Sequence, residues 1–282
     1  MVTMAGQISN LRRQLKSVKA TQKITNAMAL VSTAKLRKQR SRMVENNNYS
    51  NRYYGLVLRA MSAPRPETET NPYIVENNAN NRLHVVITSN SGLCGGYNME
   101  LLKYVEKTIN KEDPIFAIGE FGIEWLDANG YSVIRRINTL DDVIPSVISK
   151  LVSDILILYK ANEISSIDII YTQFINTITF EPSTFHLLPL DVPEDLEQRD
   201  IELVPDRDTL LDYLIPQYVG SVIYATFLEA KTSEHAARRS AMDNANRNAE
   251  ELIERISLEY NQARQTAITQ EVNEITAGAD AL

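Results

Sequence analysis

Apolar residues recur at steps of three and four near the start of the chain. They form two runs, which are Ile8, Leu11, Leu15 and Val18, followed by Ile24, Met28 and Val31. Such a narrow stripe is typical of the seam between two helices of a coiled coil. Residues 5–60 contain no proline, so a single helix can run through the whole segment. At a rise of about 1.5 Å per residue, this helix would be roughly 80 Å long.

A second stripe runs through the end of the chain. Its residues again step by three and four and are mostly small: Ala245, Ala249, Leu252, Ile256, Tyr260, Ala263 and Ala267. Small side chains let two helix axes approach closely. A helix from about Thr209 to Thr276 would be roughly 100 Å long, and few charges follow Thr266, which predicts an apolar tip. Surface helices of one globular domain are seldom this long, so we expect the two helices to pack antiparallel.

The middle of the chain has a different pattern of residues. Prolines 64, 66 and 72 and an asparagine-rich stretch at 77–81 indicate a linker. Beyond it, short apolar runs alternate with helical patterns, which is typical of an α/β domain with a largely parallel sheet. The expected strands are 83–88, 115–118, 133–134, 167–171 and 185–190, and the expected helices are 99–110, 120–128 and 140–160.

The sequence thus predicts an α/β protein combined with a long antiparallel coiled coil. Residues 1–62 and 207–282 form the two helices of a shaft. Residues 63–82 are the linker, and residues 83–206 form a small Rossmann-like domain inserted between the helices.

Positive charge is concentrated near the start of the chain. The net charge is −7, yet residues 5–60 carry 12 lysines and arginines against the single acid Glu45. Residues 61–206 have a net charge of −13, and residues 207–282 a net charge of −5. A basic helix on an acidic protein suggests a negatively charged partner. An acidic protein surface fits better than nucleic acid, because aromatic residues do not interleave with the basic ones.

The chain carries no pattern for entering or crossing a membrane. No stretch approaches the roughly 18 uninterrupted apolar residues that a spanning helix needs. Residues 1–10 lack the regions of a secretory signal. We therefore expect a cytoplasmic protein that contacts a membrane only through a partner.

One glycine cluster, at residues 92–98, follows an expected strand and opens an expected helix. Phosphate-binding loops occupy this position, but the spacing here matches neither common glycine fingerprint, and no lysine follows. Asn98 as the helix N-cap, with glycines in a tight turn, explains the segment without a ligand. Nucleotide binding at this turn remains the alternative.

No convincing catalytic set stands out. Cys94 is the only cysteine and is expected to be a buried small residue rather than a nucleophile. The three histidines are far apart in sequence, which gives no support for a metal site. The acidic pairs at 141–142 and 250–251 point in different directions on a helix, so we expect solvated faces. We expect no cofactor and no metal.

Four strings in the sequence resemble one family, the gamma subunits of F-type ATP synthases. They are TQKITNAM at 21–28, GLCGGYN at 92–98, SEHAARRSAM at 233–242 and YNQARQTAITQE at 260–271. The terminal strings are highly specific, whereas the middle domain matches mainly through its glycine turn. Residues 89–91 lack the charged residue often found there, and the redox insert of chloroplast members and a transit peptide are absent, which favours a bacterial source.

The resemblance implies a central stalk subunit without catalytic activity of its own. In that family the two helices turn inside a hexameric ring of alpha and beta subunits, and transmembrane proton flow is coupled to ATP synthesis or hydrolysis on the beta subunits. Further implied partners are the epsilon subunit and the membrane c-ring, with no nucleic acid and no direct membrane insertion. The implied location is the cytoplasmic face of the bacterial cell membrane, as a peripheral protein. A specialised rotary relative that lacks the usual membrane sector remains an alternative.

The resemblance also assigns residues to rotor–ring contact or coupling. Met28 matches a family position near an acidic loop of the beta subunit, and the basic residues 35–42 are expected to face the same loop. Residues of the C-terminal helix match positions that meet the ring or brace the shaft. The full set is Met28, Lys35, Arg37, Arg238, Arg264, Gln265, Thr269 and Glu271.

Overall fold

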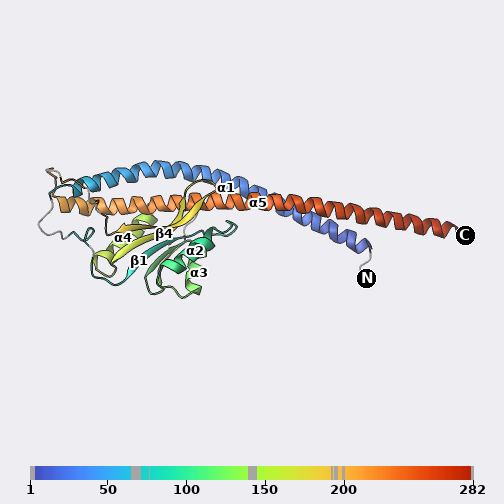
Figure 1. Ribbon diagram of the computed structural model, residues 1–282, viewed down its shortest axis with the longest axis horizontal. Helices are drawn as coiled ribbons and strands as arrows, with labels where there is room; N and C mark the ends of the chain where they lie inside the picture. The colour runs from blue at the N-terminus through green and yellow to red at the C-terminus, as the bar shows by residue number, and fades with distance from the viewer. Residues whose placement is uncertain are drawn as a thin grey trace. The chain divides into compact units, whose positions relative to one another are not determined.

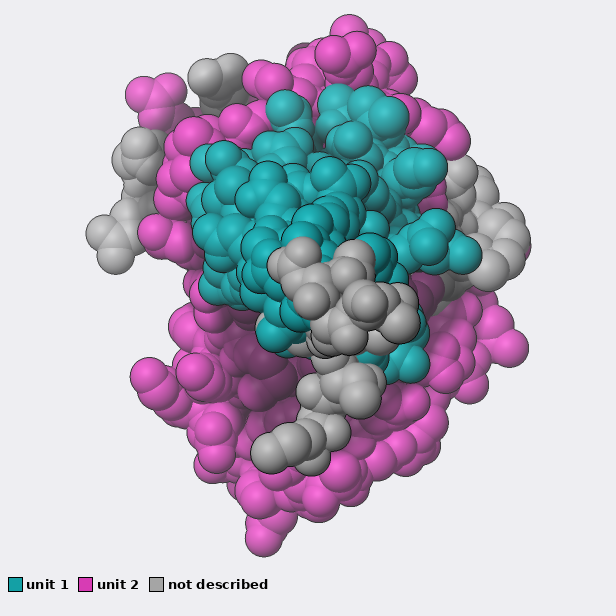
Figure 2. Space-filling model, turned by 90° about the vertical axis from the view of Figure 1, so that its right-hand side faces the viewer, with its two compact units in different colours: residues 1–33, 238–282 teal, residues 34–237 magenta. Residues whose placement is uncertain are grey.

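The computed structural model describes residues 4–64, 71–75, 77–138, 145–191, 193, 196–198 and 201–280. The chain divides into two compact units, which Figure 2 shows in different colours. Residues 1–33 and 238–282 form the coiled-coil unit, and residues 34–237 form the sheet unit. Helices α1 (Met4–Met61) and α5 (Arg207–Asp280) contribute to both units. Both terminal helices predicted from the apolar stripes are therefore confirmed.

In the coiled-coil unit, α1 and α5 are joined through polar side chains. The Gln22 amide donates a hydrogen bond to the Glu250 carboxylate at 3.3 Å. The Thr25 hydroxyl donates to Asn246, whose own amide donates to the side-chain oxygen of Asn26 at 3.3 Å. Residue numbers thus rise along one helix as they fall along the other, which confirms the antiparallel pairing.

The α5 stripe predicted from the sequence forms the seam of this unit. Ala249 and Ile256 are buried, and the other five residues of the stripe are half-buried. Met242 is buried as well and extends the stripe by one step toward the start of the helix. The small side chains at these positions allow the close helix approach that the sequence suggested.

The α1 stripe was predicted correctly only in its first half. Ile24 and Val31 are 61% and 55% exposed, so they do not belong to the seam. From Leu11 the positions that are at least half-buried continue in unbroken steps of four and three, and they are Leu15, Val18, Gln22, Thr25, Ala29 and Ser32. The prediction jumped six residues from Val18 to Ile24 to follow hydrophobicity. The heptad instead keeps its register through polar residues.

The sheet unit contains a five-stranded sheet in the order β3-β2-β1-β4-β5 (Figure 1). The strands are β1 (Arg82–Ile87), β2 (Ile115–Ile118), β3 (Val133–Ile137), β4 (Ser166–Phe174) and β5 (Phe180–Leu188). The first four run parallel, and β5 joins β4 as an antiparallel edge strand. The largely parallel α/β domain predicted from the sequence is confirmed.

Helices cover both faces of this sheet. On one face, α4 (Pro145–Lys160) and the sheet-unit parts of α1 and α5 pack with Leu83, Val85 and Ile87 of β1. On the other face, α2 (Tyr97–Thr108) and α3 (Glu120–Ala128) pack with Val86. Because successive residues of a strand point to opposite faces, the nearly continuous apolar run of β1 places buried side chains on both faces of the sheet.

The predicted elements differ from the structure mainly at their ends. The strand at 115–118 and the helix at 120–128 have the predicted bounds. The helix predicted at 140–160 is described from Pro145, and residues 139–144 lie outside the described part of the chain. The last strand begins earlier than predicted, at Phe180, because it pairs with β4 as a hairpin through Phe174.

No described helix combines the length and the hydropathy that a bilayer crossing requires.

Helix α5 begins with a polar cap. The Asp206 carboxylate accepts hydrogen bonds from the Thr209 backbone N–H at 3.0 Å and from the Thr209 hydroxyl at 2.7 Å. These bonds lower the pKa of the Asp206 carboxyl. The cap fixes where the long helix starts.

Candidate functional surfaces

The residues that the family resemblance selected in the coiled-coil unit differ in exposure. Met28 is half-buried, and Arg238 is 7% exposed. The other four are exposed on α5 beyond residue 260, and they are Arg264, Gln265, Thr269 and Glu271. The Thr269 hydroxyl donates to the backbone carbonyl of Gln265 at 2.9 Å. Arg238 is thus covered by its own chain, whereas the four exposed side chains are accessible.

In the sheet unit, the basic segment 35–42 of α1 has two faces. Leu36 and Gln39 are buried and continue the heptad. Lys35 is half-buried, and Arg37 is exposed. The exposed residues between the buried positions also include Lys38 and Arg40, so the segment presents a positively charged outer face.

Sequence reasoning missed a second apolar stripe on α1. Ala20, Ile24, Ala27 and Val31 follow one another in steps of four, three and four, and all are exposed. Leu30 beside them is also exposed. Ile24 and Val31 were predicted to lie in the seam, and only the unbroken heptad through Gln22 and Thr25 could have shown that they face outward. An apolar stripe outside a polar seam indicates a surface for a partner.

The last turns of α5 form an exposed apolar tip, as the sequence predicted. Ile268, Val272 and Ile275 are exposed and lie four and three residues apart. The spacing puts them on one face of the helix. This face is a second partner surface of the coiled-coil unit.

The glycine turn is held by its own side chains. Gly95 has a φ of +61°, which L-residues rarely adopt. Asn98 was predicted as the N-cap of α2, and this is wrong, since the helix begins at Tyr97 after Gly96. Asn98 instead accepts the Ser89 backbone N–H at 3.1 Å and donates to the Ser89 hydroxyl at 2.7 Å. It thereby ties the turn to the residues that follow β1.

The same turn packs against α5. Cys94 is buried, as predicted, and forms a small apolar cluster with Tyr97 and Ala237. The Tyr97 hydroxyl donates to the Ala230 carbonyl at 3.1 Å. The geometry fits the ligand-free explanation of the turn, because the side chains join it to the long helix.

Next to this contact, α5 carries a buried ion pair. The Lys231 ammonium lies 2.7 Å from the Glu234 carboxylate, and both side chains are almost fully buried. The ammonium also lies 5.6 Å from the ring centroid of Phe227. The Ser233 hydroxyl donates to the Thr172 carbonyl of β4 at 3.1 Å. Polar groups buried in this way favour one register of a helix against its neighbours.

Two histidines that are distant in sequence meet at one carboxylate. The Asp168 carboxylate lies 2.8 Å from Nδ1 of His186 and 3.9 Å from Nδ1 of His84. On its other side, Nε2 of His84 lies 3.3 Å from Asp113. His84, Asp168 and His186 lie on three neighbouring strands, β1, β4 and β5, and their spacing in the sequence does not reveal this. Across the described residues, no three His, Cys, Asp or Glu side chains are grouped to hold a metal ion.

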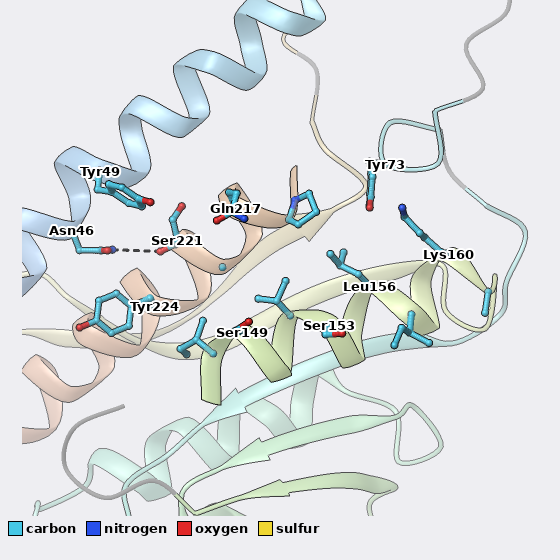
Figure 3. Close-up of a pocket in the computed structure, with 16 residues that line it drawn as sticks. Asn46, Tyr49, Tyr73, Ser149, Ser153, Leu156, Lys160, Gln217, Ser221 and Tyr224 are labelled. Carbon is cyan, nitrogen blue, oxygen red and sulfur yellow. Dashed lines mark hydrogen bonds between the residues drawn. The ribbon is translucent and has the colours of Figure 1, made fainter. Parts of the chain in front are cut away.

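A groove of about 960 Å³ opens in the sheet unit between α1, α4 and α5 (Figure 3). A hydrogen bond joins α1 to α5 in this groove, because the Asn46 amide donates to the Ser221 carbonyl at 3.4 Å. At the other end, the Lys160 ammonium lies 5.2 Å from the Tyr73 ring centroid and 3.3 Å from Asp212. Burial raises the pKa of the Tyr73 hydroxyl, partly offset by Lys160. Among the described lining residues, Lys160 is the one lysine or arginine, and it is already paired with Asp212.

Comparison with known proteins gives one consistent result. The family model described as ATP synthase matches residues 7–282. The ATP synthase gamma chain of Mycoplasma capricolum is 38% identical over 278 residues, which cover 97% of this chain and 98% of that one. The gamma chain of Lachnoclostridium phytofermentans is 37% identical over 287 residues, with coverages of 97% and 98%.

Solved structures share the fold over most of the chain. One match is to a structure of the Euglena gracilis mitochondrial ATP synthase (OSCP/F1/c-ring), with a TM-score of 0.70, 18% identity, and 98% and 95% of the two chains covered. Another is to the central stalk and c-ring of the Tetrahymena thermophila mitochondrial enzyme, with a TM-score of 0.62, 23% identity, and coverages of 79% and 99%. The chain therefore belongs to the ATP synthase gamma chain family, the central stalk subunits of F-type ATP synthases.

Proposed function

We propose that the chain turns as the shaft inside a ring of alternating alpha and beta subunits. Its angle selects which beta subunit holds nucleotide tightly, because the shaft binds the ring's conformations unequally. Transmembrane proton flow then drives ATP synthesis, and hydrolysis drives the reverse. The chain itself supplies no catalytic group, and the nucleotide chemistry occurs on the ring.

The observation that carries this proposal is the outward apolar stripe on α1. Ile24, Ala27 and Val31 are exposed in the free chain, although a monomer gains nothing from presenting them. An apolar sleeve would cover this stripe without locking it, since dispersion and hydrophobic contacts have no fixed direction. The exposed tip at Ile268, Val272 and Ile275 supports the same reading.

The basic segment supplies a different kind of contact. Arg37 and its exposed neighbours up to Arg42 present positive charge on the outer face of α1. Exposed charge pairs are weak and exchangeable, which suits a surface that passes one acidic loop after another. We assign Met28, Lys35, Arg37, Arg264, Gln265, Thr269 and Glu271 to ring contact and buried Arg238 to bracing the shaft.

The remaining assignments follow from this role. The sheet unit attaches the shaft to the epsilon subunit and the membrane c-ring, so the chain is peripheral on the cytoplasmic face of the membrane. We retain the division into a helix at 1–62, a linker at 63–82, an α/β domain at 83–206 and a helix at 207–282.

The direct test is Met28→Lys in the assembled enzyme. Met28 is half-buried on the basic helix α1, so an added charge disturbs both the seam and the neighbouring partner surface. We expect ATP hydrolysis to persist while ATP-driven proton pumping in vesicles falls. Met28→Leu is the control and should pump normally. Equal pumping by Met28→Lys and Met28→Leu would remove Met28 from the contact set.

A nucleotide-binding enzyme built on the glycine turn is the alternative to exclude. Isothermal titration of the chain with ATP should give no tight binding, since Asn98 and Cys94 fill the turn. Tight binding that is lost in Asn98→Ala would support the enzyme instead.

A further inference from the structure

A second cavity of the sheet unit lies between α1, α5 and β5 and has a volume of about 500 Å³. This volume is in the range of small-molecule sites, roughly 300–1,000 Å³. It is separate from the groove of Figure 3, which lies between α1 and α4, and it shares no lining residue with that groove. The cavity is therefore a candidate site that the rotor contacts do not use.

The lining combines aromatic rings with carboxylates. Two carboxylates contribute, from Glu229 and Asp191. The described lining residues include no lysine or arginine, and the basic side chain among them, His186, lies 2.8 Å from the Asp168 carboxylate. The aromatic lining residues are Tyr54, Tyr171, Phe185 and Tyr218. The rings of Tyr54 and Tyr218 lie 5.7 Å apart at a tilt of 32°. Ring faces carry negative charge density, so rings and carboxylates together make an electronegative cavity.

Glu229 is the anchor of this charge. Its carboxylate accepts the Phe174 backbone N–H at 3.0 Å and interacts with the Tyr171 hydroxyl. No described basic side chain forms an ion pair with it. Burial raises the pKa of the Glu229 carboxyl, and burial together with the Tyr54 and Asp191 charges raises the pKa of Tyr218 to about 12. Glu229 is half-buried, so its carboxylate loses part of its hydration without gaining an ion pair, and a bound cation would offset that loss.

The chemistry of the lining selects the type of cation. A hydrated divalent metal needs several oxygen ligands in a fixed geometry, and the described residues offer no such group. Aromatic faces favour organic ammonium groups, which lose their water more readily. We infer that this cavity binds a small organic amine cation of the polyamine or quaternary ammonium class, with Glu229 as its counter-ion and the rings of Tyr54 and Tyr218 as its walls.

Titration calorimetry of the full chain with spermidine, and separately with tetraethylammonium, tests this inference. Saturable binding of at least one cation is expected, weakened about ten-fold or more in Glu229→Gln. Glu163→Gln is the matched control, because Glu163 is an exposed carboxylate outside the cavity. The control should bind like the unchanged protein.

Two outcomes overturn the inference. One is no saturable binding of either cation, and the other is equal weakening in Glu229→Gln and Glu163→Gln, which would indicate a diffuse counter-ion effect. If Glu229→Gln does not fold, as judged by circular dichroism, Asp191→Asn and Tyr54→Leu decide. Both positions are at least partly exposed, and both variants should weaken binding.

Discussion

The coiled-coil unit and the sheet unit bury different kinds of residue. The sheet unit encloses large aliphatic and aromatic side chains on both faces of its sheet. The seam of the coiled-coil unit mixes aliphatic residues such as Leu11 and Ile256 with alanines and polar residues, while Ile24 and Val31 face outward. Its polar members are Gln22, Thr25 and Ser32. The sheet unit therefore stabilises itself, whereas the coiled-coil unit keeps much of its apolar surface for a partner.

The largest effect of a single change is expected in the sheet unit. Ile169 of β4 is fully buried, and Ile169→Ala would leave a cavity in the packed core. We expect a loss of about 3 kcal/mol in the free energy of unfolding, measured by urea denaturation. Ile178→Ala is the control, because Ile178 is exposed in the β4–β5 hairpin and should change little. Similar losses in both would mean that the sheet unit lacks a tight core.

A smaller effect is expected at the seam of the coiled-coil unit. Ala249 is buried where the helices approach closely, and Ala249→Leu would force them apart at a cost of about 2 kcal/mol. The exposed neighbour position, Asn248→Leu, should cost little. Thermal unfolding followed by circular dichroism separates the two variants. If Ala249→Leu were neutral, the seam would be looser than the small residues indicate.

The smallest effect on the free chain is expected on the outward stripe. Val31→Asn should change the free energy of unfolding by less than about 0.5 kcal/mol, because Val31 is exposed. The same variant should weaken binding to the alpha–beta ring, measured by co-purification under increasing salt and detergent. A clear loss of stability in the free chain would mean that Val31 packs in the seam. It would then contradict the difference described between the two units.

The sequence predicted what periodicity and local chemistry determine. The α5 stripe was correct because its apolar positions keep one register from Ala245 to Ala267. The α1 stripe was wrong at Ile24 and Val31, because these apolar residues lie on the outer face while polar residues such as Gln22 and Thr25 occupy the seam. A single sequence does not tell an apolar stripe that faces its own chain from one that faces another chain.

Contacts between distant segments were beyond the reach of the sequence. Asp168 joins two histidines only through strand register. Asn98 is a residue type that often caps helices, yet its side chain joins the turn to Ser89. Likewise, the acidic aromatic cavity collects residues from two helices, two strands and a loop. The family resemblance supplied candidate contact residues, but only the structure separates buried Arg238 from the exposed residues near the end of α5.

The central claim is that the chain turns inside its ring, and single-molecule observation tests it most directly. Lys107 is exposed on α2, and the only native cysteine, Cys94, is buried, so Lys107→Cys accepts a probe selectively. With the ring fixed to a surface and ATP supplied, the account predicts stepwise rotation of the probe in one direction. A probe that stays at one angle while the same complexes hydrolyse ATP would contradict it.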